Sequence, residues 1–158
     1  DEDMIDFPLH VTQTNYRLHI AYKVSESITF KNRIELIDYN ESTLPVKKGY
    51  LIYQDIIFKA LSSPFSFTMR YALFDTQDYD ARIYAYENDV LYSFTTPSYY
   101  YRGSRVYGIL RYQYKKMFDL WIRYGQWLYN NQDTLGSGLS TITGNRKSEI
   151  KIQLIWKF

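Results

Sequence analysis

The sequence predicts an all-β fold, an antiparallel up-and-down β-barrel of about eight or nine strands or the C-terminal portion of a larger one. Apolar and polar residues alternate with a period of two along most of the 158 residues, as in strands that have two different faces. No run has the period of a helix, and polar stretches separate the alternating runs. Because this length suffices for one sizeable core, we expect a single domain over residues 1–158.

Each expected strand follows from one alternating run. In the first run Tyr16, Leu18 and Ile20 alternate with Arg17 and His19, and the later runs repeat this pattern. In chain order the expected strands are 16–24, 28–36, 49–61, 65–73, 81–94, 105–115, 118–128 and 148–158.

The stretch 81–94, ARIYAYENDVLYSF, has two interpretations: one long strand, or two short strands that turn at Glu87, Asn88 and Asp89. The other short connections are 25–27, 62–64 and 115–116, and the long ones are 40–48, 75–80, 95–104 and 130–147. A turn at Glu87 gives nine strands with every short connection on one side, as in outer-membrane barrels. A single strand gives eight and splits the short connections between both sides, so we favour nine.

Nine is odd, whereas single-chain bacterial barrels have even strand numbers. Either further strands precede Asp1 in the parent chain, or the count of eight is correct. The chain begins DEDMIDFP, without an initiator Met or a signal peptide. We therefore interpret it as a mature protein or a piece of a longer one.

Alternation alone does not separate a soluble barrel, which is apolar inside, from a transmembrane barrel, which is apolar outside. Three features favour the transmembrane barrel. The apolar faces are large and aromatic, and strands of about 9–11 residues suffice to cross a bilayer. Tyr and Trp also gather near strand ends, as in interfacial belts; they are Tyr99, Tyr100 and Tyr101 at one end, and Tyr112, Tyr114, Trp156 and Phe158 at the other. A soluble ligand-binding β-barrel is the alternative.

The transmembrane interpretation assigns each alternating side chain to lipid or to the lumen. The side chains expected to face the membrane are Phe65, Phe67, Met69, Leu110, Leu120, Ile122, Ile150, Ile152, Leu154, Trp156 and Phe158. The charged side chains expected in the lumen are Arg17, Lys31, Arg33, Glu35, Arg70, Arg111, Asp119, Arg123 and Lys151. Cations predominate in the lumen, which either favours anionic solutes or reflects cross-strand pairing with carboxylates.

Composition excludes several other functions. Charged residues make up 23% of the chain, with a formal net charge of +2, and basic residues form no patch, so we expect no nucleic-acid partner. There is no Cys, no metal-ligand cluster and no glycine-rich phosphate loop, so we expect no cofactor and no metal. The acidic stretches DEDMID and DTQDYD lack the EF-hand pattern and are interpreted as solvated loops.

The sequence does not predict an enzyme. It contains only His10 and His19, and no G-x-S-x-G stretch. A membrane-embedded hydrolase with His19 as its base is a second alternative. The loop from Gly136 to Asn145 is flexible by composition and could contact a partner protein outside the cell.

The last nine residues, IKIQLIWKF, place an aromatic residue at the end of the chain and apolar residues at every second position before it. This pattern resembles the C-terminal strand of Gram-negative outer-membrane proteins. The resemblance implies location in the bacterial outer membrane, contact with its lipid, and assembly by the barrel-assembly machinery through this strand. It is compatible with a pore, a transporter or a membrane anchor.

The stretches YDARIYAYENDVLYSF and RGSRVYGILRY are also similar to outer-membrane barrels fused to N-terminal helix-hairpin-helix segments. No helix-hairpin-helix segment lies within the 158 residues, so this second resemblance adds no nucleic-acid role.

Overall fold

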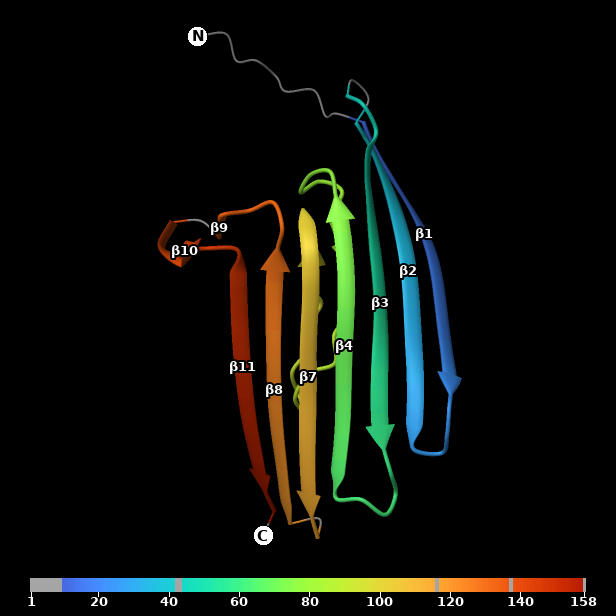
Figure 1. The fold of residues 1–158 in the computed structure, drawn as a ribbon, viewed down its shortest axis with the longest axis vertical. Coiled ribbons are helices and arrows are strands. Elements are labelled where there is room, and N and C mark those ends of the chain that lie inside the picture. The colour runs from blue at the N-terminus through green and yellow to red at the C-terminus, as the bar shows by residue number, and fades with distance from the viewer. Residues whose placement is uncertain (1–9, 42–43, 116, 137, 158) are drawn as a thin grey trace.

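The computed structural model describes residues 10–41, 44–115, 117–136 and 138–157. Within them, seven long strands form one antiparallel meander, which we call the main sheet (Figure 1). In order of pairing, the strands are β1 (Val11–Lys23), β2 (Ile28–Glu41), β3 (Lys47–Lys59), β4 (Phe65–Thr76), β7 (Arg102–Tyr114), β8 (Phe118–Tyr129) and β11 (Arg146–Trp156).

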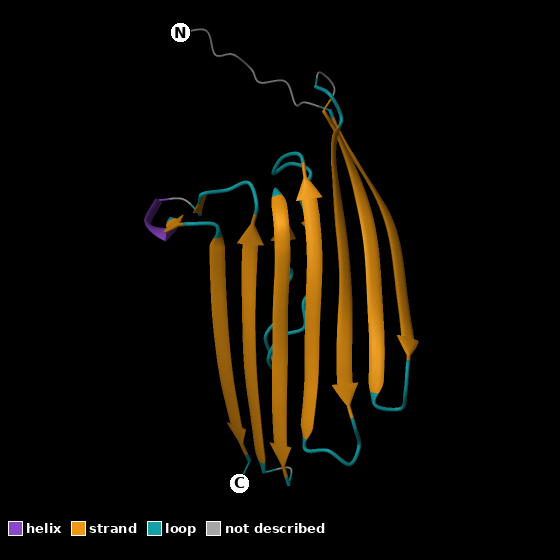
Figure 2. Ribbon diagram, viewed as in Figure 1, coloured by secondary structure: helices purple, strands orange, loops and turns teal. Residues whose placement is uncertain are grey.

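The remaining elements are short (Figure 2). They are β5 (Ile83–Tyr84) paired with β6 (Ser98–Tyr99), β9 (Thr134–Leu135) paired with β10 (Ile142–Thr143), and the 3₁₀ turn η1 (Gly138–Ser140). The all-β antiparallel prediction is thus confirmed. No helix in the described part of the chain is long and apolar enough to cross a membrane.

The expected count of eight or nine strands is wrong for the described residues. The stretch 81–94 contributes no strand to the main sheet, because β4 pairs directly with β7, for example Met69 with Gly108. The links before and after this stretch therefore merge into one long connection. The short turns β1–β2, β3–β4 and β7–β8 then all lie at one end of the sheet, with the long connections at the other end (Figure 1).

The main sheet is not closed into a barrel within the described residues. β1 pairs only with β2, and β11 only with β8, so each has a free edge. The two edge strands also run in the same direction (Figure 1), as they must in an antiparallel sheet with an odd number of strands.

A compact aromatic core lies on one face of the sheet near the long connections. Phe74 of β4 contacts Tyr99 of β6 and Trp127 of β8, with ring centroids 5.4 and 5.7 Å apart. Tyr99 is fully buried, so its expected place in an interfacial belt is wrong. The physical reason is that its hydroxyl donates to the Glu87 carboxylate at 2.8 Å, which draws the ring inward.

Candidate functional site

The connection from β4 to β7, residues 77–101, folds back along the main sheet and is called the inner segment. Figure 1 shows it behind β4 and β7. The sheet face that it covers is the inner face, and the opposite face is the outer face. Ala81, Ile83 and Ala85 of the inner segment are buried, whereas Tyr84 and Tyr86 are exposed. The alternation that predicted a strand here therefore reflects an extended segment that lies flat on the sheet.

Arginine side chains of the sheet hold the backbone of the inner segment. Arg33 of β2 donates to the Tyr84 carbonyl at 3.2 Å, and Arg70 of β4 donates to the Tyr86 carbonyl at 2.7 Å. Arg123 of β8 donates to the carbonyl of residue 88 at 3.3 Å. These alternate carbonyls lie on one side of an extended chain, and the guanidinium groups supply the donors that a neighbouring strand would otherwise supply.

Glu87 is the centre of a buried ion-pair network. Its side chain is fully buried and accepts a hydrogen bond from Nε of Arg105 at 3.1 Å, while its other oxygen binds Arg123. Both arginines also bind Glu149 of β11. Gly125 makes this arrangement possible, because a Cβ there would lie 2.7 Å from Nη2 of Arg105. The network therefore joins the inner segment to β7, β8 and β11.

Asp89 forms a second anchor one step along the segment. Lys151 of β11 donates to its carboxylate at 2.6 Å, the Val90 N–H donates at 2.8 Å, and Thr95 also donates. Burial raises the pKa of Asp89, but these hydrogen bonds and the Arg123 charge outweigh it, so its pKa lies below its ordinary value. Asp89 is thus held ionised against the inner face.

The sheet also pairs charges between its own strands. The carboxylate of Asp55 on β3 accepts a hydrogen bond from Nη2 of Arg70 at 2.8 Å. The guanidinium carbon of Arg70 also lies over the Tyr53 ring, 3.6 Å from its centroid. Arg111 of β7 donates to Asp119 of β8 at 2.8 Å. For these residues, the structure therefore agrees with the second interpretation of the inner-face cations, which is that they pair with carboxylates on neighbouring strands.

All the charged residues expected in a lumen lie on the inner face. Those with an ion pair are Arg17, Arg33, Glu35, Arg70, Arg111, Asp119, Arg123 and Lys151. Lys31 has no ion pair among the described residues. Glu87 and Asp89 are not among the predicted inner-face charges, because the sequence pattern favours a turn of the wall at these residues. The available signal was the excess of cations on the inner face, which required carboxylates from another segment.

The outer face presents the apolar side chains to the surroundings. Those expected to face a membrane and exposed here are Phe65, Phe67, Met69, Leu110, Ile150, Ile152, Leu154 and Trp156. Leu120 and Ile122 lie on the same face and are partly exposed, and Phe158 lies outside the described residues. Polar exceptions include Gln54, which donates to the Asn32 side chain at 3.1 Å.

Aromatic rings line the outer face at the end with the short turns. Phe65 contacts Tyr112, Tyr112 contacts Phe118, and Phe118 contacts Trp156, with ring centroids 4.8, 6.4 and 6.2 Å apart. Near the other end the exposed rings are Tyr16 and Tyr50 rather than the expected run 99–101.

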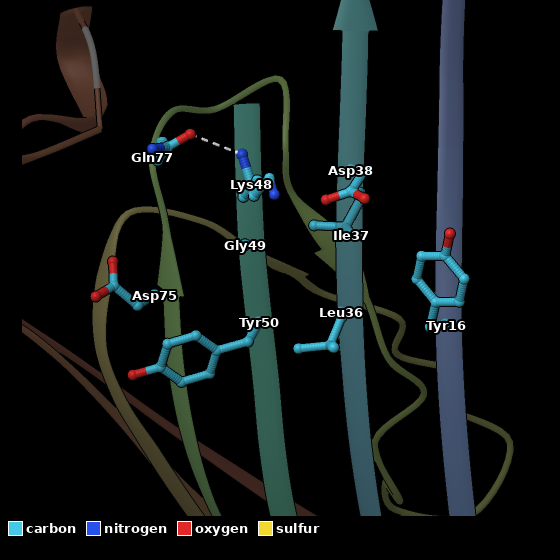
Figure 3. Close-up of a pocket in the computed structure, with 9 residues that line it drawn as sticks. All are labelled: Tyr16, Leu36, Ile37, Asp38, Lys48, Gly49, Tyr50, Asp75 and Gln77. Carbon is cyan, nitrogen blue, oxygen red and sulfur yellow. Dashed lines mark hydrogen bonds between the residues drawn. The ribbon is translucent and has the colours of Figure 1, made fainter. Parts of the chain in front are cut away.

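Tyr16 and Tyr50 border a surface hollow of about 470 Å³ on the outer face (Figure 3). Leu36 adds an apolar wall, while Lys48 and Gln77 lie at its upper rim, where the Lys48 N–H donates to Gln77 Oε1 at 2.7 Å. The hollow thus changes from apolar to polar toward the long connections.

The described residues provide little for catalysis or metal binding. They contain no group of three or more His, Asp or Glu side chains arranged to hold a metal ion. Asp78 and Asp80 instead bind Lys47 at 2.9 and 2.6 Å. The hollow beside His19 is lined by Tyr53 and Tyr86 but by no Ser or Thr among the described residues, so His19 has no Ser or Thr hydroxyl to activate there.

Comparison of the chain with models of protein families, with curated proteins and with solved structures finds no match.

Proposed function

We propose that the main sheet is part of the wall of a β-barrel in the bacterial outer membrane, with its outer face against lipid and the inner segment inside the lumen. The observation that carries this proposal is the inverted placement of side chains. Arg105, Arg123 and Glu87 are buried, whereas Ile150 and Ile152 are each 66% exposed. A soluble sheet places these residue types the other way round.

The physical argument concerns the cost of the outer face in water. Soluble monomers rarely expose continuous apolar patches larger than a few hundred Å². Here every strand of the main sheet contributes exposed apolar side chains, from Tyr16 and Leu18 on β1 to Leu154 and Trp156 on β11. In lipid this exposure carries no hydrophobic cost, and the strand ladders satisfy the backbone. A soluble ligand-binding barrel instead requires these side chains in a dry centre.

The free edges of β1 and β11 indicate that further strands are needed to close the proposed barrel wall. A closed single-chain bacterial barrel has an even number of antiparallel strands. The main sheet has an odd number within the described residues, with parallel edges. We therefore propose that the sheet is the C-terminal portion of a larger barrel, completed by an odd number of further strands. β11 supplies the edge that the barrel-assembly machinery would recognise.

The inner segment favours a pore or transporter over a bare anchor. Glu87 and Asp89 fix it against the inner face, so it narrows the proposed lumen. A constriction inside a lumen governs what passes through it, which is a task of a pore or transporter and not of a bare anchor. A pore with this constriction is thus the first candidate, and a membrane anchor is the second.

The experiment that tests the membrane proposal is extraction and gel migration of the full chain. We expect extraction from membranes only with detergent, and faster migration of the unheated protein than of the heated protein. A protein that remains soluble without detergent and migrates identically after heating would contradict the proposal.

Conductance in planar bilayers separates the pore from the anchor. Replacing residues 81–97 by a short Gly-Ser linker removes the constriction, so single-channel conductance should rise if the protein is a pore. No conductance from either protein, despite correct insertion, would favour the anchor.

A further inference from the structure

A second hollow, of about 200 Å³, lies on the inner face between β1–β4 and the inner segment. Its cationic lining comes from Arg17 of β1, Lys31 and Arg33 of β2, and Arg70 of β4, and His19 of β1 also borders it. Tyr86 and Asn88 of the inner segment line the side of the hollow that faces the sheet. A liquid water molecule occupies about 30 Å³, so the hollow has room for a small ion with some of its water.

The carboxylates near this hollow do not balance its cations. Arg70 is paired with Asp55, whereas Arg17 and Arg33 share the single carboxylate of Glu35. The distances from Nη2 and Nε of Arg17 to Glu35 are 2.9 and 3.1 Å, so Glu35 is already fully engaged.

The side chains of Lys31 and His19 make no ion pair or hydrogen bond with the part of the chain that the structure describes. Among the described residues, the four Arg and Lys side chains of the hollow are opposed by two carboxylates, which leaves two positive charges without a counter-charge there. Concentrated positive charge of this kind attracts anions and repels cations.

Arg33 adds an independent observation. Its side chain is only 8% exposed, yet its Nε has no hydrogen-bond partner among the described residues. A buried N–H without an acceptor is energetically costly in proteins, so an acceptor is expected beside it. Arg33 and the unpaired Lys31 both line this hollow, and the Nε atom itself is buried.

We propose that this hollow binds a doubly charged oxyanion, namely the phosphate group of a small solute. A phosphate monoester carries close to two negative charges at neutral pH, which matches the charge excess. Its three acceptor oxygens suit donors that come from different strands, here the Arg17 guanidinium of β1 and Lys31 Nζ of β2. A single carboxylate would leave one positive charge unbalanced. This inference rests on the proposed function, because it needs the inner face to meet a water-filled lumen.

The test is calorimetric titration of inorganic phosphate into the full chain in detergent micelles at constant ionic strength. The variant Lys31→Gln removes an unpaired charge of the hollow without breaking an ion pair. We expect saturable binding to the unaltered protein and about tenfold weaker binding to Lys31→Gln. Lys59→Gln is the matched control, because Lys59 lies on the same face but lines other hollows.

Further titrants define the site. Sulfate should compete with phosphate and nitrate should not, since only sulfate is doubly charged. Phosphatidic acid added to the micelles should leave phosphate binding unchanged, because the inner face does not meet lipid; competition by this lipid would contradict the location.

Absence of saturable phosphate binding by protein that shows heat-modifiable migration would overturn this inference and leave the proposed function intact. Equal weakening by Lys59→Gln would also overturn it, since the effect would then reflect general charge. If migration is not heat-modifiable, it is the proposed function that fails, and the titration still reports separately on the site.

Discussion

Glu87 is the side chain on which the inner segment depends most at the scale of single residues. It is fully buried and bound by two arginines and a tyrosine hydroxyl. Removing one partner of a buried ion pair is far more costly than the pair is worth, because a charge is left buried without compensation.

Glu87→Gln tests this dependence. Among the described residues, Arg105 would keep only Glu149 as an ion-pair partner, and Arg123 would keep Glu149 and the more distant Asp89, so we expect a loss of about 3 kcal/mol in the free energy of unfolding. Urea unfolding in lipid vesicles measures this loss. Glu149→Gln is the matched control and should cost less than half as much, since its side chain is 33% exposed. An equal or greater cost for the control would show that Glu87 is not the main anchor.

The amide pair on the outer face provides a second test at this scale. Gln54 donates to Asn32, and both lie among apolar side chains. In hydrocarbon, an amide that loses its partner stays unsatisfied, whereas in water it binds solvent.

The double variant Asn32→Val with Gln54→Leu should therefore be more stable in vesicles than the sum of the two single variants predicts. We expect a coupling of about 0.6 kcal/mol, the average for such bonds in membrane proteins. Urea unfolding of the two single variants and the double variant supplies the comparison. Strict additivity would indicate that water reaches this row of the outer face.

At the scale of elements, the inner segment shows which structural features could be predicted from the sequence and which could not. Alternation located the extended runs, since strands in either environment show the same period. It did not reveal that 81–94 lies on the sheet instead of in it, because a period of two specifies extended backbone and not the hydrogen-bond partner. The guanidinium groups of Arg33 and Arg70 supply that partner, and they come from strands distant in the sequence.

The same limit applies to the candidate site. The face on which the charged strand residues lie could be predicted, because they alternate with apolar neighbours along each strand, as Arg111 and Asp119 do. Glu87 and Asp89 did not, since their role depends on a long connection folding inward. Tyr99 was misplaced for a related reason: an aromatic near a strand end suits a lipid interface and an aromatic core equally well.

Acid should loosen the inner segment through Asp89. Its pKa in the folded protein lies below the value near 3.9 expected for an unfolded chain. Asp89 therefore stabilises the folded segment above about pH 3.9, and this contribution disappears as the pH falls through the folded-state pKa. The groups that face it are Lys151 and Arg123 from the sheet, and Ser93 and Thr95 from the segment itself.

A nitroxide label at the exposed Tyr92 position reports on this loosening. Its mobility should rise on acidification of the unaltered protein, and rise much less with Asp89→Asn, whose segment is already loosened at neutral pH. Identical acid responses of the two proteins would assign the effect to other carboxylates.

At the scale of the whole molecule, the two faces of the main sheet have opposite chemical character. The inner face holds paired charges and the inner segment, and the outer face holds a continuous apolar surface with aromatic rings at one end. Such a sheet is stable in water only if something apolar covers its outer face, and lipid does so without any specific partner.

The most direct measurement is the accessibility of nitroxide labels in lipid vesicles. The chain has no Cys, so single Cys substitutions give unique labels. Leu110, Ile122 and Ile152 occupy one register row of the outer face, and Lys59 lies on the inner face. The account predicts that labels in the row collide more with oxygen, which concentrates in lipid, than with a water-soluble nickel chelate, and that the label at Lys59 shows the reverse. Labels at Leu110, Ile122 and Ile152 that meet the nickel chelate freely, or that neither reagent reaches, would contradict it.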